Sequence, residues 1–192
     1  METRPKIVEI KCDSQEETYI VWWLEELRVN GYISHYDRAG TFLLSPRQIT
    51  TKVVQLKTKS KELPVEVLSS HSYTPDFKVW WTEKAYGVFV TDQLYGDLLY
   101  STQCDTFFIT YLEVKPGFDQ NNMTRLFKIN QKWLFLQLGI FVNLIVPAKL
   151  FSKTFAPIRF FFTNKTNKPR KLDGSYRSLI DYVAGDKTPT SC

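Results

Sequence analysis

Two apolar segments constrain the fold of this 192-residue chain more than any other feature. Residues 77–81 (FKVWW) and 107–114 (FFITYLEV) are rich in β-branched and aromatic residues, a composition that favours buried β-strands. Yet Asp76 precedes the first segment, and the second contains Glu113 and is followed by Lys115. Charged side chains are rarely buried without a partner, so these three residues need an explanation other than core packing.

A helix is predicted near the start of the chain. Ser14 and Glu17 have the spacing of a capping box, and Gly31 can end the helix in a left-handed conformation. Apolar residues recur between them at helical spacing: Ile20, Trp23, Leu24 and Leu27.

A second helix is predicted after Pro116, capped by Asn121 or Asn122 and ended by Gly139. Its expected apolar stripe consists of Leu126, Ile129, Trp133 and Leu136. The continuous apolar run at 140–146 follows it and is typical of a buried strand.

The remaining β pattern completes an α-β-β-β-α-β core order. Strands are also expected at 65–71 and 86–90, and short strands in GTFLLS and KVVQLK, whereas 57–64 (KTKSKELP) is typical of a charged loop. Residues 1–162 therefore form the predicted domain. Residues 163–192 are predicted to be a basic linker, a short helix and a disordered tail.

Composition restricts the class of protein and its partners. Hydrophobic residues make up 43% of the chain, enough for one folded domain. From residue 121 onward, twelve Lys or Arg face three Asp or Glu, which favours a polyanionic partner. The three cysteines form no metal-binding or disulfide pattern, and no apolar run is long enough for a membrane span. We therefore expect a cytoplasmic protein.

The acids and the lysine predict a metal site. Glu113 and Lys115 are two residues apart on a strand and therefore share one face, and Asp76 joins that face if the two strands are neighbours. Two carboxylates at close range repel each other unless a cation lies between them. Mg²⁺ suits this arrangement because it is bound by one or two carboxylates and leaves positions for water and phosphate.

The PDF sequence at 75–77 and the EVK sequence at 113–115 resemble the PD-(D/E)xK nuclease superfamily. Over about residues 14–146 the chain looks like its phage-type endonucleases, a group that includes Holliday-junction resolvases and transposon-end nucleases. The resemblance implies a restriction-endonuclease-like core, a mixed central sheet flanked by helices. It also implies that Asp76, Glu113 and the Val114 carbonyl bind Mg²⁺, with Mn²⁺ as a substitute, and that Lys115 orients the attacking water.

Further residues follow from the same resemblance. Relatives often add a glutamate from the first helix, and Glu17 matches that position, with Glu16 as a neighbouring competitor. Asp76 and Glu113 are 37 positions apart, more than the short hairpin of the family allows, which implies an inserted hairpin or loop at about 82–106. On the second helix, Arg125, Lys128 and Lys132 have the spacing of a nucleic-acid-binding stripe.

The expected function is a metal-dependent DNA endonuclease encoded by a phage or mobile element, acting in the host cytoplasm. The likeness to resolvases implies a homodimer and selectivity for branched DNA. The alternative is a non-catalytic nucleic-acid-binding or phage assembly module on the same fold. That module would use the basic C-terminal part for binding. Each site residue also has a structural reading: the E-x-K pair as a surface ion pair, Glu17 as a helix cap, and the basic residues of the second helix as a solvated face.

Overall fold

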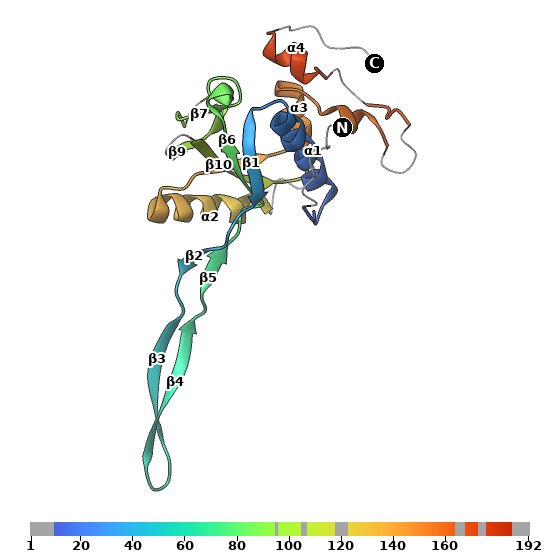
Figure 1. Cartoon of the computed structure of the whole chain (residues 1–192). Helices are drawn as coiled ribbons and strands as arrows, with labels where there is room; N and C mark the ends of the chain where they lie inside the picture. The colour runs from blue at the N-terminus through green and yellow to red at the C-terminus, as the bar shows by residue number, and fades with distance from the viewer. Residues whose placement is uncertain are drawn as a thin grey trace, which may run out of the picture.

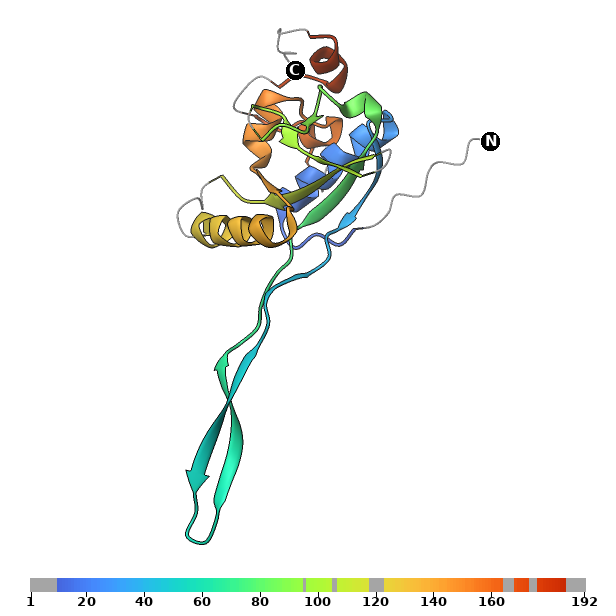
Figure 2. The ribbon, with the colours of Figure 1, turned by 90° about the vertical axis from the view of Figure 1, so that its left-hand side faces the viewer.

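The central sheet has the strand order β1-β6-β10-β11. In this computed structural model, which describes residues 10–94, 96–104, 107–117, 123–163, 168–172 and 176–185, helices cover both faces of the sheet and a long two-stranded arm projects from it (Figures 1 and 2). The expected mixed α/β class is confirmed.

Antiparallel pairing joins the first three strands. β1 (Ile33–Arg38) pairs with β6 (Phe77–Trp81), and β6 pairs with β10 (Phe107–Val114). β11 (Val142–Ile145) lies parallel to β10, and β9 (Thr102–Cys104) pairs with the beginning of β10. The apolar segments at 77–81 and 107–114 are therefore neighbouring strands.

The first helix, α1 (Gln15–Val29), has the predicted ends and buried face. The Ser14 side chain accepts the Glu17 N–H at 3.1 Å, and Gly31 has a φ of 76°. The predicted stripe is buried, with Trp23 packed against Trp81 of the sheet. The same face is covered by α3 (Pro147–Lys153), the 3₁₀ helix η2 (Ile158–Phe161) and α4 (Leu179–Val183).

The second helix, α2 (Met123–Leu138), lies on the opposite face of the sheet. Gly139 follows it with a φ of 67°, as predicted, while the proposed caps Asn121 and Asn122 lie outside the described residues. The α2 core cluster contains Val142 and the partly buried Tyr111, whereas Leu112 and Val114 belong to the α1 side. This alternation along β10 places the two helices on different faces.

The predicted apolar stripe of α2 was wrong at three of its four positions; the fourth, Trp133, is partly buried against the core as predicted. Leu126, Ile129 and Leu136 are 58%, 51% and 83% exposed, and the buried apolar residues are Phe127 and Leu134. The helix is rotated because Phe127 and Leu134 pack against the base of the arm and the beginning of β11. These tertiary contacts, rather than the periodicity of the helix, select its buried face.

The arm is inserted between β1 and β6. At its base, β2 (Phe42–Ser45) pairs with β5 (His71–Tyr73), and further out β3 (Gln48–Gln55) pairs with β4 (Ser60–Leu68). The charged loop expected at 57–64 was wrong in its second half, because residues 60–64 belong to β4 and the Leu56 N–H bonds the Lys59 carbonyl across the turn.

The segment between β6 and β10 is compact. It contains η1 (Glu83–Ala85), a small parallel pair of β7 (Val90–Thr91) with β8 (Leu99–Tyr100), and β9. The strand predicted at 86–90 was wrong, since only Val90 belongs to a strand. The insertion does not separate β6 from β10.

No helix in the described part of the chain combines the length and apolarity of a membrane span.

Candidate active site

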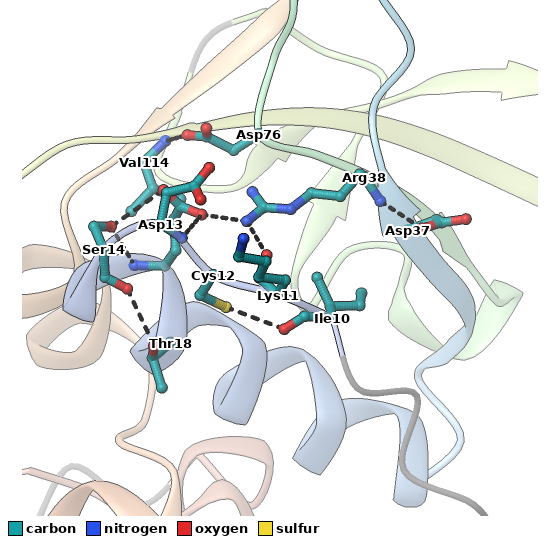
Figure 3. A network of polar contacts seen from close by, with 11 residues as sticks. Ile10, Lys11, Cys12, Asp13, Ser14, Thr18, Asp37, Arg38, Asp76 and Val114 are labelled. Atoms are coloured by element: carbon teal, nitrogen blue, oxygen red, sulfur yellow. Dashed lines mark hydrogen bonds and ion pairs between the residues drawn. The ribbon is translucent and has the colours of Figure 1, made fainter.

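The site lies where β6 begins and β10 ends. Phe77 and Leu112 are the last registered pair between the two strands, and the Asp76 N–H extends the pairing by bonding the Leu112 carbonyl at 2.9 Å. At the next position of the ladder a side chain, rather than a main-chain carbonyl, is the acceptor: Asp76 Oδ2 accepts the Val114 N–H at 2.6 Å (Figure 3). Asp76 is thereby fixed opposite the EVK sequence.

Glu113 and Lys115 form an ion pair on β10. Lys115 Nζ lies 2.6 Å from Glu113 Oε1, and their side chains are 18% and 9% exposed. The Tyr73 hydroxyl, at the end of β5, donates to the other Glu113 oxygen at 3.0 Å. The Lys115 N–H bonds the Ile145 carbonyl of β11 at 2.8 Å. The Glu113 side chain is therefore held by Tyr73 and Lys115, while the main chain of Lys115 is fixed to β11.

Glu17 reaches the same region from α1. Its Oε2 lies 2.5 Å from Arg38 Nη2, and the same oxygen accepts the Asp13 N–H at 3.2 Å. Its other oxygen accepts the Ser14 hydroxyl at 3.2 Å. Arg38, at the end of β1, also extends toward the segment that precedes α1 (Figure 3). Glu17 therefore combines the predicted capping role with an ion pair at the site.

Burial and neighbouring carboxylates raise the pKa of Asp76 to about 6. Burial is the largest cause, the Val114 N–H opposes it, and the charges of Glu113 and Glu17 raise the pKa further. The charge of Lys115 lowers it. The other three predicted catalytic residues thus all act electrostatically on Asp76. Burial and Glu113 also raise the pKa of Tyr73, which keeps its hydroxyl a donor.

The oxygen donors of the site suit a metal that needs few protein ligands. No group of three or more His, Cys, Asp or Glu side chains within the described ranges could hold a metal. Asp76 and Glu113 remain, with the Val114 carbonyl, which should point to the same side as the Val114 N–H and therefore toward Asp76. Two carboxylates and one carbonyl fit Mg²⁺, which retains several waters, better than a closed Zn²⁺ or Ca²⁺ site.

The charge balance of the site also suits a cation. Three carboxylates, from Asp76, Glu113 and Glu17, face two cations, Lys115 and Arg38. Arg38 pairs with Glu17 and Lys115 pairs with Glu113, while Asp76 forms no ion pair within the described part of the chain. A hard divalent ion beside Asp76 would offset the repulsion that raises its pKa.

A basic pocket of about 520 Å³ adjoins the site. Its lining includes Lys115, Lys128 of α2, and Lys149 and Lys153 of α3. Lys153 also lies 2.5 Å from Asp97 at the rim. Of the three basic residues predicted on the second helix, only Lys128 lines this pocket; Arg125 and Lys132 are exposed elsewhere on α2.

Four residues of this region were missed from the sequence. Arg38 lies opposite Phe77 in the β1–β6 pairing and Tyr73 lies at the end of β5, so both reach the site through tertiary pairing that no local spacing signals. Lys149 and Lys153 are four residues apart, the spacing of one helix face, and could have been recognised as a second basic pair.

A scan against protein-family models matches no family, and searches of the curated proteins and of the solved structures find no significant match. The function is therefore inferred from the geometry of the site and from its motifs. What the fold and site define is a mixed α/β protein with an acidic and basic cluster at the point where two central strands meet.

Proposed function

We propose that the chain is a Mg²⁺-dependent DNA endonuclease of the PD-(D/E)xK type. One observation carries this proposal. The Asp76 carboxylate accepts the Val114 N–H of the EVK sequence at 2.6 Å, and beside it Lys115 Nζ lies 2.6 Å from Glu113 Oε1. The chain order through the sheet, α1-β1-β6-β10-α2-β11, is compatible with a restriction-endonuclease-like core.

Each residue has a role in phosphodiester hydrolysis. Asp76, Glu113 and the Val114 carbonyl would hold Mg²⁺, which when bound supplies Lewis-acid stabilisation of charge on the phosphate. Lys115, held by Glu113, is placed to orient the attacking water and to donate to a phosphate oxygen. Tyr73 keeps Glu113 in position from the side of the arm.

The basic pocket supports a nucleic-acid substrate. Three lysines beside Lys115 offer charge to the phosphates that flank the scissile bond. Such contacts release counterions, so binding should weaken steeply as salt concentration rises. A homodimer and selectivity for junctions belong to this proposal through the likeness to resolvases.

The test is nicking of supercoiled plasmid in Mg²⁺ or Mn²⁺, with and without EDTA. We expect EDTA and Asp76→Asn to abolish nicking, because asparagine keeps an acceptor for Val114 but loses the charge that binds the metal. Glu26→Gln is the matched control, since Glu26 is a partly buried carboxylate outside the site that accepts the Ile158 N–H at 2.9 Å. EDTA-resistant nicking, or equal nicking by Asp76→Asn, would contradict the proposal.

The carboxylates of Glu113 and Glu17 already have hydrogen-bond and ion-pair partners within the protein, which favours a second candidate, a non-catalytic nucleic-acid-binding module. Both Glu113 oxygens already have protein partners, and Glu17 is occupied by its cap and Arg38. This candidate predicts salt-sensitive DNA binding that does not depend on divalent ions, with no nicking by the wild-type chain.

A further inference from the structure

The arm has no partner within the described part of the molecule along most of its length. Both views show β3 and β4 projecting away from the sheet and helices (Figures 1 and 2). Aliphatic side chains on it, such as Ile49, Val53 and Val67, are 56%, 59% and 59% exposed. Because an isolated two-stranded ribbon is marginally stable in water, an arm of this length indicates a binding partner.

The strand register separates the charges of the arm onto two faces. Residues directly opposite each other in an antiparallel pair share a face. Lys52 pairs with Leu63 and Val54 pairs with Lys61, which places both lysines on one face. Ile49 pairs with Glu66 and Val53 pairs with Glu62, which places both glutamates on the other.

The tip of the arm adds to the basic face. Lys57 and Lys59 lie in the turn that joins β3 to β4, so residues 52–61 contain four lysines and no acid. Closer to the base, Glu66 is neutralised by Arg47 at 2.5 Å. The outer part of the arm is therefore complementary to a polyanion.

This charge separation disfavours a second copy of the chain as the partner. A two-fold interface brings the same patch of each copy together. Face-to-face packing of two arms would then oppose lysine with lysine or glutamate with glutamate. A polyanion meets no such conflict on the lysine face.

The base of the arm adjoins the candidate active site. The strand β1 ends at Arg38, which binds Glu17, and β5 ends at Tyr73, which binds Glu113. A duplex held at the site therefore lies beside the base. The 15 residues from Phe42 to Leu56 span at most about 50 Å, since a strand rises about 3.3 Å per residue. This length corresponds to about 15 base pairs of duplex.

We propose that the arm binds the phosphate backbone of duplex DNA to one side of the cleavage position, through the face carrying Lys52 and Lys61 and through the tip lysines Lys57 and Lys59. A two-stranded ribbon has the dimensions to enter a major groove. The choice of DNA as the polyanion rests on the proposed function. The contacts are to phosphate, so they favour long duplexes without favouring a sequence.

The experiment measures binding by fluorescence anisotropy with Asp76→Asn protein, which should not cleave. The probes are a 12-base-pair and a 40-base-pair duplex across a series of NaCl concentrations. Replacing Lys52, Lys57, Lys59 and Lys61 together by alanine should weaken binding of the long duplex by at least tenfold. It should also reduce the salt slope by about 3.6, since each of the four phosphate contacts contributes about 0.9. The short duplex should lose less affinity.

Two further variants serve as controls. Glu62→Gln, on the opposite face, should leave the affinity for the long duplex undiminished. The tip variant Lys57→Ala with Lys59→Ala alters only the turn and should give about half of the loss in salt slope, even if the fourfold variant folds poorly. An unchanged salt slope in both lysine variants would overturn the proposal. Loss of self-association in sedimentation, with DNA affinity retained, would overturn it in favour of an arm-mediated dimer.

The result is separable from that of the proposed function. If the wild-type chain never nicks DNA but the lysine variants lose the long-duplex affinity, the arm inference stands while the endonuclease proposal fails. If nicking depends on Asp76 but long-duplex affinity does not depend on the arm, the reverse holds.

Discussion

The Asp76 carboxylate accepts the main-chain N–H of Val114 at 2.6 Å, so a side chain replaces a strand carbonyl at the end of the β6–β10 ladder. This bond holds the partly buried carboxylate beside the EVK sequence. The negative charge of Asp76 is poorly compensated, because the group is partly buried and the carboxylates of Glu113 and Glu17 repel it.

Asp76→Asn should stabilise the metal-free protein at neutral pH. The folded-state pKa of about 6 lies above the ordinary value of 3.8, so the ionised carboxylate disfavours folding. The difference corresponds to roughly 2–3 kcal/mol in the free energy of unfolding, because one pKa unit is about 1.4 kcal/mol. Urea denaturation at pH 7.5 in EDTA measures this, and a less stable variant would contradict it.

The same pKa predicts a pH dependence of stability. Because the folded pKa is raised, the contribution of Asp76 to stability is fully present below about pH 4 and is lost as the pH rises through about 6. In EDTA, the stability difference between Asp76→Asn and wild type should therefore be small near pH 4 and largest above pH 7. A difference that does not change between pH 4 and 8 would show that the pKa of Asp76 is ordinary.

Lys115→Met should abolish cleavage while DNA binding persists. The substitution keeps the length of the side chain and removes the charge that faces Glu113 at 2.6 Å. Loss of a positioned donor in a site of this kind lowers rates by about 10²–10³. Single-turnover nicking and anisotropy binding measure the two effects separately. Cleavage at the wild-type rate would remove Lys115 from the mechanism.

Tyr73→Phe should raise the Mg²⁺ concentration needed for half-maximal nicking. The hydroxyl holds one Glu113 oxygen at 3.0 Å, and its loss should cost about 1–3 kcal/mol in the free energy of unfolding. Tyr36→Phe is the matched control, because Tyr36 donates to Glu25 at 3.1 Å away from the site. An equal change in Mg²⁺ requirement in both variants would mean that the effect is on stability alone.

Lys128→Ala should weaken DNA binding more than Arg125→Ala or Lys132→Ala. The sequence pattern treats the three residues alike, but only Lys128 lines the pocket beside Lys115. We expect a several-fold loss of affinity and a salt slope lower by about 1 for Lys128→Ala. Lys149→Ala should behave in the same way. Equal effects of all three α2 substitutions would indicate that DNA lies along the whole helix.

Local signals in the sequence were sufficient for α1 and for the two central strands. The Ser14 cap, the Gly31 end and the buried stripe of α1 depend on residues within one helix, and all three are confirmed. The expectation that Asp76 lies near Glu113 required only that two apolar strands be neighbours, which the β6–β10 pairing confirms. The roles assigned to these residues remain predictions.

Features that depend on tertiary partners could not be predicted. The buried face of α2 is chosen by contacts of Phe127 and Leu134 with distant segments, so the helical periodicity of Leu126 and Ile129 was misleading. The arm was misread because its lysines resemble a solvated loop, although Lys61 belongs to a regular strand. The contact between Arg38 and Glu17 could not be predicted either, because no local sequence pattern places the end of β1 beside the start of α1.

The insertion of the arm between β1 and β6 has a mechanical consequence. Tyr73 is the last residue of β5, the final strand of the arm. The hydroxyl that positions Glu113 therefore belongs to the same continuous chain segment as an arm tens of ångströms long. A displacement of β5 at the base of the arm would therefore move the Tyr73 hydroxyl relative to Glu113 directly, without any intervening domain.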